Sequence, residues 1–271
     1  MNAAEPALAR AIAALEAELG IPLAYHALNR ATGWTASHRA DEVTASASTY
    51  KLALLLHVAR KVGAGQADWA APLHFGDHHR SWGTGILGQL SADLRLPLKD
   101  ICWLMTVLSD NSATDLLVET FGLDAVNRTL SDLGFRHTRL LAQDAPPGPH
   151  GRPPLAAGQT TPAEMARLLL GIQDATFVPH SSADLLLEML AAQQDHTMIA
   201  RRLPAGWHYA GKTGSNADLR ADVGVVTAPS GDRTVLALYA TPLASDDWSV
   251  DSPGTLAVAR LAQILISFSS R

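Results

Sequence analysis

The sequence predicts an α+β protein, with an antiparallel sheet built from both ends of the chain, helices flanking it, and a helical domain inserted between its two parts. Strand patterns occur near the N-terminus and return after about residue 207. About 150 residues between them carry mostly helical patterns. We therefore expect a sheet-containing domain over 1–47 and 205–271, a largely helical domain over 48–204, and an active site between them. A chain of 271 residues is long enough to bury a sizeable core.

The elements follow in order along the chain. A helix over about 5–19 precedes a hairpin, with strands at 21–28 and 34–42 joined by the turn NRATG. Several of the helices in the middle open with Ser, Thr or Asp at the N-cap position. We expect these helices over 48–62, 96–109, 111–122, 123–134, 161–172 and 181–193. Strands return at 207–215, 221–228 and 233–241, and a helix over 252–268 closes the chain.

One stretch, AQDAPPGPHGRPPLAAGQ over 142–159, interrupts the helical region. It is too rich in Pro and Gly for a helix or a strand. Loops of this length in a compact domain are often functional, and the alternative is a solvated linker.

Composition and charge exclude several classes of partner. The net charge is −5 and there is no long basic run, so neither nucleic acid nor an anionic membrane is expected to bind. No apolar stretch has the length of a bilayer span, and the single cysteine, Cys102, excludes an intrachain disulfide. We expect a monomer. It would be cytoplasmic if the chain is full length, and periplasmic or secreted if a leader has been removed.

A serine and a lysine three residues apart, Ser48 and Lys51, begin the helix pattern at 48–62. The chain prefers arginine to lysine elsewhere, and only lysine can lose its proton at an accessible pH. Two residues at this spacing lie on one helix face, within reach of each other. Ser48 is therefore a candidate nucleophile and Lys51 its base, and the alternative for Ser48 is a simple N-cap.

Two further motifs accompany this pair: Ser109-Asp110-Asn111 and Lys212-Thr213-Gly214. In this order and with these separations, the three motifs resemble those of the class A-like serine β-lactamases and penicillin-binding serine hydrolases. The segments LNRATG, GTGIL and TTPAEMA extend the resemblance over nearly the whole chain. It implies a β-lactamase-like fold and an acyl-enzyme mechanism without a metal or a cofactor.

The resemblance also implies roles for individual residues. Ser109 would relay a proton to the departing nitrogen, and Lys212 would set the electrostatics of that step. Asn111 would bind the amide of the substrate's side chain and hold the base. The backbone N–H groups of Ser48 and Ser215 would form an oxyanion hole.

Further residues are expected to bind the substrate. Thr213, Gly214 and Ser215 would receive the substrate carboxylate. Arg220 is either the cationic partner of that carboxylate or a surface arginine at a strand edge. Trp82, just before GTGIL, either lines the rim of the cleft or packs as an ordinary aromatic residue.

The sequence departs from the family at the residue that activates water for deacylation. The family has a Glu-x-x-x-Asn arrangement there, and counting from Thr138-Arg139-Leu140 places Asp144 at the glutamate and Gly148 at the asparagine. Asp144 is either a catalytic base, one methylene short, or a loop residue without a catalytic role. Acylation should survive, whereas deacylation is in question.

Three functions remain open for a small-molecule β-lactam or acyl-D-amino-acid-like substrate. The first is hydrolysis of the β-lactam ring, which would be slow without the usual glutamate. The second is a D-Ala-D-Ala peptidase or an esterase with the same acylation machinery. The third is a penicillin-binding or sensor protein that is acylated and stays acylated.

Histidines in HFGDHHRSWGTGIL suggest a metal site, because His74 and His78 are four residues apart and His79 follows. The pattern is not helical, and Asp77 is the one carboxylate nearby in the sequence. We therefore expect a polar loop near the cleft and no metal.

Overall fold

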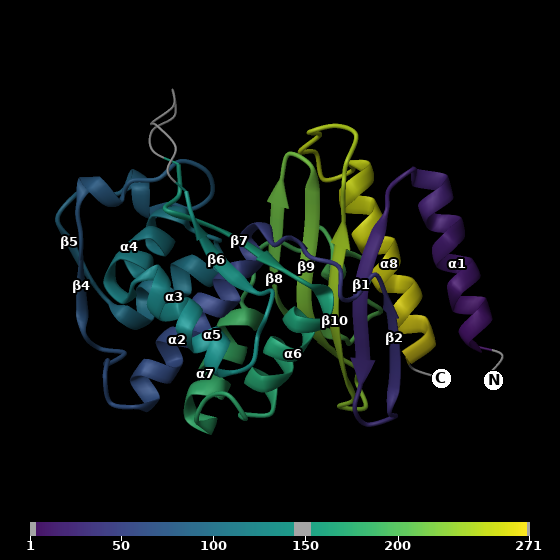
Figure 1. Ribbon diagram of the computed structural model, residues 1–271, viewed down its shortest axis with the longest axis horizontal. Coiled ribbons are helices and arrows are strands. Elements are labelled where there is room, and N and C mark those ends of the chain that lie inside the picture. Colours follow the sequence, from purple (N-terminus) through teal and green to yellow (C-terminus); the bar gives the residue numbers. More distant parts are fainter. Residues whose placement is uncertain (1–3, 144–152, 270–271) are drawn as a thin grey trace.

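The computed structural model describes residues 4–143 and 153–269, and its centre is a five-stranded antiparallel sheet (Figure 1). The strand order is β2-β1-β10-β9-β8, so the two ends of the chain meet between β1 and β10. The strands are β1 (Leu23–Asn29), β2 (Trp34–His38), β8 (His208–Asn216), β9 (Leu219–Thr227) and β10 (Arg233–Ala240). The predicted fold class, with a sheet formed from both termini, is confirmed.

Helices cover both faces of this sheet. The terminal helices α1 (Ala4–Leu19) and α8 (Pro253–Ser269) lie together on one face, shown on the right in Figure 1. Their apolar side chains share a core with residues of β1 and β10. The inner strand β9 is buried along almost its whole length, because side chains on both faces of the sheet are covered.

The helical part of the chain packs against the other face. It comprises α2 (Lys51–Gly63), α3 (Leu98–Val107), α4 (Asn111–Phe121), α5 (Leu123–Asp132), α6 (Pro162–Gln173) and α7 (His180–Ala191). Helix α2 lies at its centre, since every residue from Lys51 to Ala59 is buried. A helix that is apolar all round is stable only inside a core, as α2 is here.

Three small strand pairings, which the sequence analysis did not predict, complete the helical part. Strands β4 (Pro72–Phe75) and β5 (Leu94–Pro97) form one hairpin. Strand β7 (Ala156–Thr160) pairs with β6 (Arg139–Ala142) on one side and with β3 (Thr44–Ala45) on the other.

The expectation of a loop over 142–159 is therefore wrong at its two ends. Ala142 ends β6, and β7 begins at Ala156. A side chain at Gly158 would lie 2.4 Å from Ser46 Oγ, so glycine allows β7 to pack closely against the turn that carries Ser48. Ala, Gly and Gln have low strand propensity, and these contacts over long sequence distances determine the strand instead.

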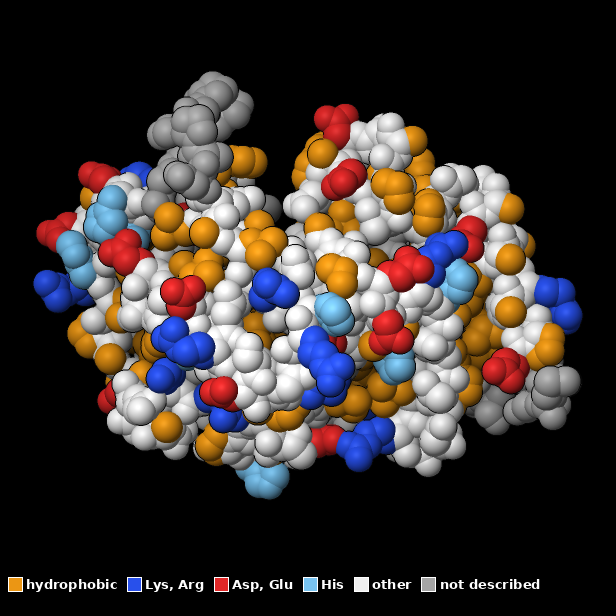
Figure 2. Space-filling model, in the orientation of Figure 1, with side chains coloured by type: hydrophobic (Ala, Val, Ile, Leu, Met, Phe, Trp, Pro, Cys, Tyr) orange, Lys and Arg blue, Asp and Glu red, His pale blue; other side chains and the backbone are white. Residues whose placement is uncertain are grey.

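The predicted domain boundaries, at 47/48 and 204/205, stay a prediction. Among the described residues, no helix is both long and apolar enough to cross a membrane. The space-filling view shows a notch at the upper edge of the molecule, between the helical part and the sheet (Figure 2).

Candidate active site

The serine of the first motif lies in a tight turn that leads into α2. Ser48 belongs to the 3₁₀ turn Ala47–Tyr50, and the α-helix begins at Lys51, three residues later than expected. Ala47, directly before the serine, has a φ of +42°. A non-glycine residue in this region is strained, and such strain is often found at functional sites. Ser48 is half-buried, whereas Lys51 is buried.

Strand β8 brings the third motif against this turn. A Cβ atom on Gly214 would lie 2.9 Å from the backbone nitrogen of Ser48 and 3.0 Å from that of Thr49. The absence of a side chain at Gly214 therefore allows the two backbones to touch. Ser215 follows directly, so its backbone lies beside the turn, as an oxyanion hole formed by Ser48 and Ser215 would require.

Lys51 connects the first motif to the second. Its Nζ donates to the backbone oxygen of Ser109 at 2.6 Å, to Ser109 Oγ at 3.1 Å and to Asn111 Oδ1 at 2.7 Å. Ser109 has a φ of +53°, a second strained backbone position at the site. The side chains of Lys51, Ser109 and Asn111 thus meet in one cluster, and Lys51 follows Ser48 by three residues.

Burial and like charge change the basicity of Lys51. Burial is the largest cause, followed by the charge of Lys212, and together they lower the pKa of Lys51 well below its usual value. The carboxylates of Asp110 and Asp115 oppose this shift without cancelling it. A lysine of this kind is readily neutral and can accept a proton from a serine hydroxyl.

Lys212 is itself buried on β8, where its Nζ donates to the backbone oxygen of Thr213 at 2.9 Å. Burial lowers the pKa of Lys212 to about 8, and the negative charges of Asp195 and Asp222 act in the opposite direction. Lys212 therefore remains largely cationic at neutral pH. Thr213, the next residue of the motif, is also buried.

Asp110 is a structural residue that the sequence analysis left without a role. Its Oδ1 accepts the N–H of Ala113 at 2.9 Å and caps α4. Its Oδ2 accepts the N–H groups of Ile86 and Leu87, each at 2.7 Å. The signal available in the sequence was an aspartate directly before a helix pattern, which is a common N-cap.

The segment 80–89 forms a wall beside Asn111. Asn111 Nδ2 donates to the backbone oxygen of Trp82 at 2.9 Å, and Thr84 Oγ1 donates to that of Ser109 at 2.7 Å. A side chain on Gly83 would lie 2.4 Å from Asn111 Nδ2. Trp82 is 48% exposed, which disfavours ordinary packing for its side chain. A cavity of about 480 Å³ lies between this segment and the start of α4, and Ser48 does not line it.

Arg220 lies on β9 directly opposite Ser215 of β8. It is 2% exposed, so the interpretation as a surface arginine is wrong. Its guanidinium donates to the backbone oxygens of Asn216, Leu219 and Asp247. The sequence did not reveal that a loop after β10 would cover this residue.

Asp144 and Gly148 lie outside the described residues. The described residues on either side of them are held in place. Gln143 N–H donates to the backbone oxygen of Leu155 at 2.9 Å, and Leu155 N–H donates to Asp115 Oδ1 at 2.8 Å.

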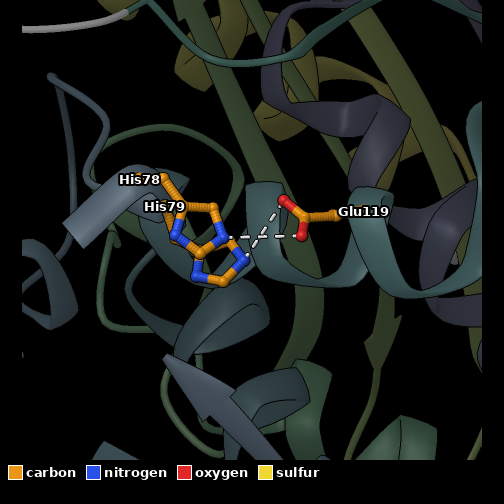
Figure 3. Close-up of side chains that lie close together, drawn as sticks. All are labelled: His78, His79 and Glu119. Carbon is orange, nitrogen blue, oxygen red and sulfur yellow. Dashed lines mark ion pairs between the residues drawn. The ribbon is translucent and has the colours of Figure 1, made fainter. Parts of the chain in front are cut away.

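His78 and His79 face Glu119 of α4, a carboxylate that the sequence analysis did not connect with them (Figure 3). The histidine Nε2 atoms lie 3.5 and 3.3 Å from the oxygens of Glu119. Gly76 N–H donates to His79 Nδ1 at 3.0 Å, so the ring proton of neutral His79 sits on Nε2, the nitrogen that lies 3.3 Å from Glu119. A metal at this place would need the lone pair of Nε2. The hydrogen bond from Gly76 to Nδ1 therefore argues against a metal bound to His79. That the chain holds no metal stays a prediction.

Comparison with known proteins agrees with this arrangement. The chain is 30% identical to a β-lactamase from Streptomyces lavendulae, over 97% of this chain and 86% of that protein. A β-lactamase from Sphaerobacter thermophilus superposes with a TM-score of 0.84 at 29% identity, over 97% of each chain. The structure of PBP-A has the same TM-score at 20% identity, again over 97% of each chain, and this similarity concerns the fold alone.

A family model also matches nearly the whole chain. The Beta-lactamase enzyme family model covers residues 7–268, which is almost the whole chain and includes all three motifs. On this evidence, together with the fold and the two relatives, the chain belongs to the class A-like serine β-lactamase family.

Proposed function

We propose that this protein is a serine hydrolase that opens the β-lactam ring through an acyl-enzyme on Ser48. One observation carries the proposal: Lys51, three residues after Ser48, has a buried Nζ that is hydrogen-bonded to Ser109 and Asn111, and its pKa is strongly lowered. Such a nitrogen is a base suited to activating a serine at neutral pH.

Acylation would use residues of all three motifs. Lys51 takes the proton of Ser48 as Oγ attacks the carbonyl carbon of the ring, and the N–H groups of Ser48 and Ser215 stabilise the oxyanion. Ser109 then passes its hydroxyl proton to the ring nitrogen as the C–N bond breaks, and the proton that Lys51 took from Ser48 moves to Ser109 Oγ, so Lys51 is neutral again. The products of this step are an ester on Ser48 and a free amine within the opened ring.

Positive charge on β8 and β9 would bind the substrate's carboxylate. Lys212 supplies a largely cationic ammonium, and Thr213 and Ser215 supply hydroxyl donors. Arg220, opposite Ser215 in the sheet, supplies a guanidinium. The amide of Asn111 and the rim residue Trp82 would receive the other end of the substrate.

Deacylation requires a base that activates water. Asp144 stands at the glutamate position and is the candidate, and its shorter side chain predicts slow turnover. This substitution also favours a second candidate, a penicillin-binding protein that stays acylated. A PBP-A variant with the same fold has been solved as an acyl-enzyme complex with penicillin G. A D-Ala-D-Ala peptidase or esterase would use the same acylation steps.

Intact mass after mixing with excess penicillin, followed over time with penicilloate in parallel, tests the proposal. A transient adduct with accumulating penicilloate supports a β-lactamase. An adduct that persists for hours supports a penicillin-binding protein. No adduct on the wild type, or an undiminished adduct on Ser48→Ala, contradicts the acyl-enzyme mechanism on Ser48.

A further inference from the structure

Trp248 lies on the guanidinium of Arg220 in the loop between β10 and α8, which is the yellow loop at the top of Figure 1. The indole centroid is 4.6 Å from Arg220 Cζ. Arg220 is 2% exposed, whereas Trp248 is 61% exposed. The indole thus covers the guanidinium with one part of its surface and leaves the larger part open to solvent.

The hydrogen bonds of Arg220 leave donors free on the guanidinium. Nη1 donates to the backbone oxygens of Asn216 and Leu219, at 2.5 and 2.9 Å, and Nη2 donates to that of Asp247 at 2.5 Å. An arginine has five N–H donors. In the part of the chain that the structure describes, Nε–H and one Nη2–H have no acceptor, and these two can receive a carboxylate.

The loop that carries Trp248 is held on both sides of the tryptophan. Before it, the backbone oxygen of Asp247 accepts a hydrogen bond from Arg220 Nη2, and Asp247 Oδ1 accepts the N–H of Ser249 at 2.8 Å. After it, Asp251 pairs with Arg201 at 2.6 Å. An aromatic side chain on an anchored loop loses little conformational entropy when a ligand binds to it.

We propose that Trp248 contacts the substrate and forms an apolar subsite for the group attached next to the substrate's carboxylate. A carboxylate on the free donors of Arg220 brings its neighbouring atoms alongside the stacked indole. The protein would therefore prefer β-lactams that carry an aromatic or apolar substituent at that position. The inference rests on the proposed function, because it takes Arg220 as the partner of the substrate carboxylate.

A tryptophan that only holds Arg220 in place would behave differently. Its loss would weaken the binding of every substrate carboxylate to the same extent, whatever group lies beside the carboxylate. A substrate contact, by contrast, changes the ratio between two substrates that differ in that group alone. The ratio of acylation rates therefore separates the two roles.

The test uses two β-lactams that differ only in the group next to the carboxylate, an aryl substituent in one and hydrogen in the other. The second-order rate of adduct formation on Ser48 is measured by intact mass for the wild type and for Trp248→Ala. We expect Trp248→Ala to lower the second-order rate of adduct formation by about three- to tenfold with the aryl substrate, and by less than about twofold with the substrate that carries hydrogen. Trp248→Phe, which keeps an aromatic face, should retain most of the preference.

Val250→Ala is the matched control, because Val250 is 57% exposed in the same loop. Its ratio of acylation rates with the two substrates should equal that of the wild type. An equal loss for both substrates in Trp248→Ala, or no change in either, overturns the subsite and leaves the proposed function intact. The absence of an adduct with either substrate on the wild type overturns both.

Discussion

Lys51 Nζ donates a 2.7 Å hydrogen bond to Asn111 Oδ1, and this bond joins two motifs that are 60 residues apart in the chain. The same nitrogen also holds the backbone and side chain of Ser109. The candidate base is therefore positioned by the segment that would deliver the proton to the leaving group. A substitution of Lys51 should therefore slow the acylation of Ser48 and also remove hydrogen bonds that hold residues 109–111 in place.

Replacement of Lys51 by arginine separates charge from basicity. Arginine keeps the positive charge but cannot become neutral at any accessible pH. We expect Lys51→Arg and Lys51→Ala each to lower the rate of Ser48 acylation by about 10²–10⁴-fold, the usual contribution of a general base. Stopped-flow or mass measurements of adduct formation with penicillin check this. An arginine variant within tenfold of the wild type would show that Lys51 is not the base.

The pH dependence of acylation should have two limbs. Lys51 must be neutral, so the rate falls as the pH drops through its lowered pKa. Lys212 must be cationic, and its pKa is about 8, so the rate also falls as the pH rises above about 8. In Lys212→Arg the charge persists, and the alkaline limb should move to higher pH. A profile of the second-order acylation rate from pH 5 to about 10 measures both limbs, and an alkaline limb unchanged in the arginine variant excludes Lys212 as its origin.

Local patterns were sufficient to predict most of the fold. The helix and strand signals of the two termini identified the large sheet, and N-cap residues such as Thr161 marked where helices begin. The patterns predicted one antiparallel sheet from both termini but not its strand order, and the pairing of β1 with β10 comes from the structure. The three motifs also predicted that Lys51, Ser109 and Asn111 belong to one site, because each motif is a short run of residues that can be recognised from the sequence alone.

Features that depend on distant contacts could not be predicted in this way. Strand β7 has the composition of a loop and exists because it packs on the turn of Ser48. The burial of Arg220 depends on the loop after β10, whose contact residue Asp247 lies 27 residues further along the chain. Glu119 reaches His78 and His79 only because α4 lies beside the 3₁₀ turn Asp77–His79, which carries the two histidines. In each case the determining partner is remote in the sequence.

Addition of a single methyl group at Gly214 should disable the site. Its Cβ would lie 2.9 Å from the backbone nitrogen of Ser48, and both neighbours are backbone that cannot move freely. We expect Gly214→Ala to lower acylation by about a hundredfold, since a displacement of about 1 Å can have that effect. Asn216→Ala, an exposed position on the same strand, serves as the control. Acylation of the Gly214 variant at the wild-type rate would mean that the close approach has no part in catalysis.

Asp110 should be more important for stability than for chemistry. Asp110→Ala leaves the N–H groups of Ile86, Leu87 and Ala113 without their acceptor, and we expect a loss on the order of 3 kcal/mol in the free energy of unfolding. Thermal unfolding should show a lower Tm, by about 2–4 °C for each kcal/mol. Asp124→Ala removes an exposed aspartate from the first turn of α5 and should change stability by about 0.5 kcal/mol or less. Equal Tm values for the two variants would contradict this role of Asp110.

Asp144 is the candidate base for turnover of the acyl-enzyme, and its role can be tested directly. If Asp144 activates the deacylating water, Asp144→Asn acylates at the wild-type rate and then retains the adduct about a hundredfold longer, because the amide cannot accept a proton. Asp144→Glu restores the missing methylene and should shorten the lifetime of the adduct. Adduct decay after removal of free penicillin, followed by intact mass, measures all three proteins. Equal lifetimes for the wild type and Asp144→Asn would exclude the residue as the base, and a lifetime of hours in both would favour a penicillin-binding protein over a β-lactamase.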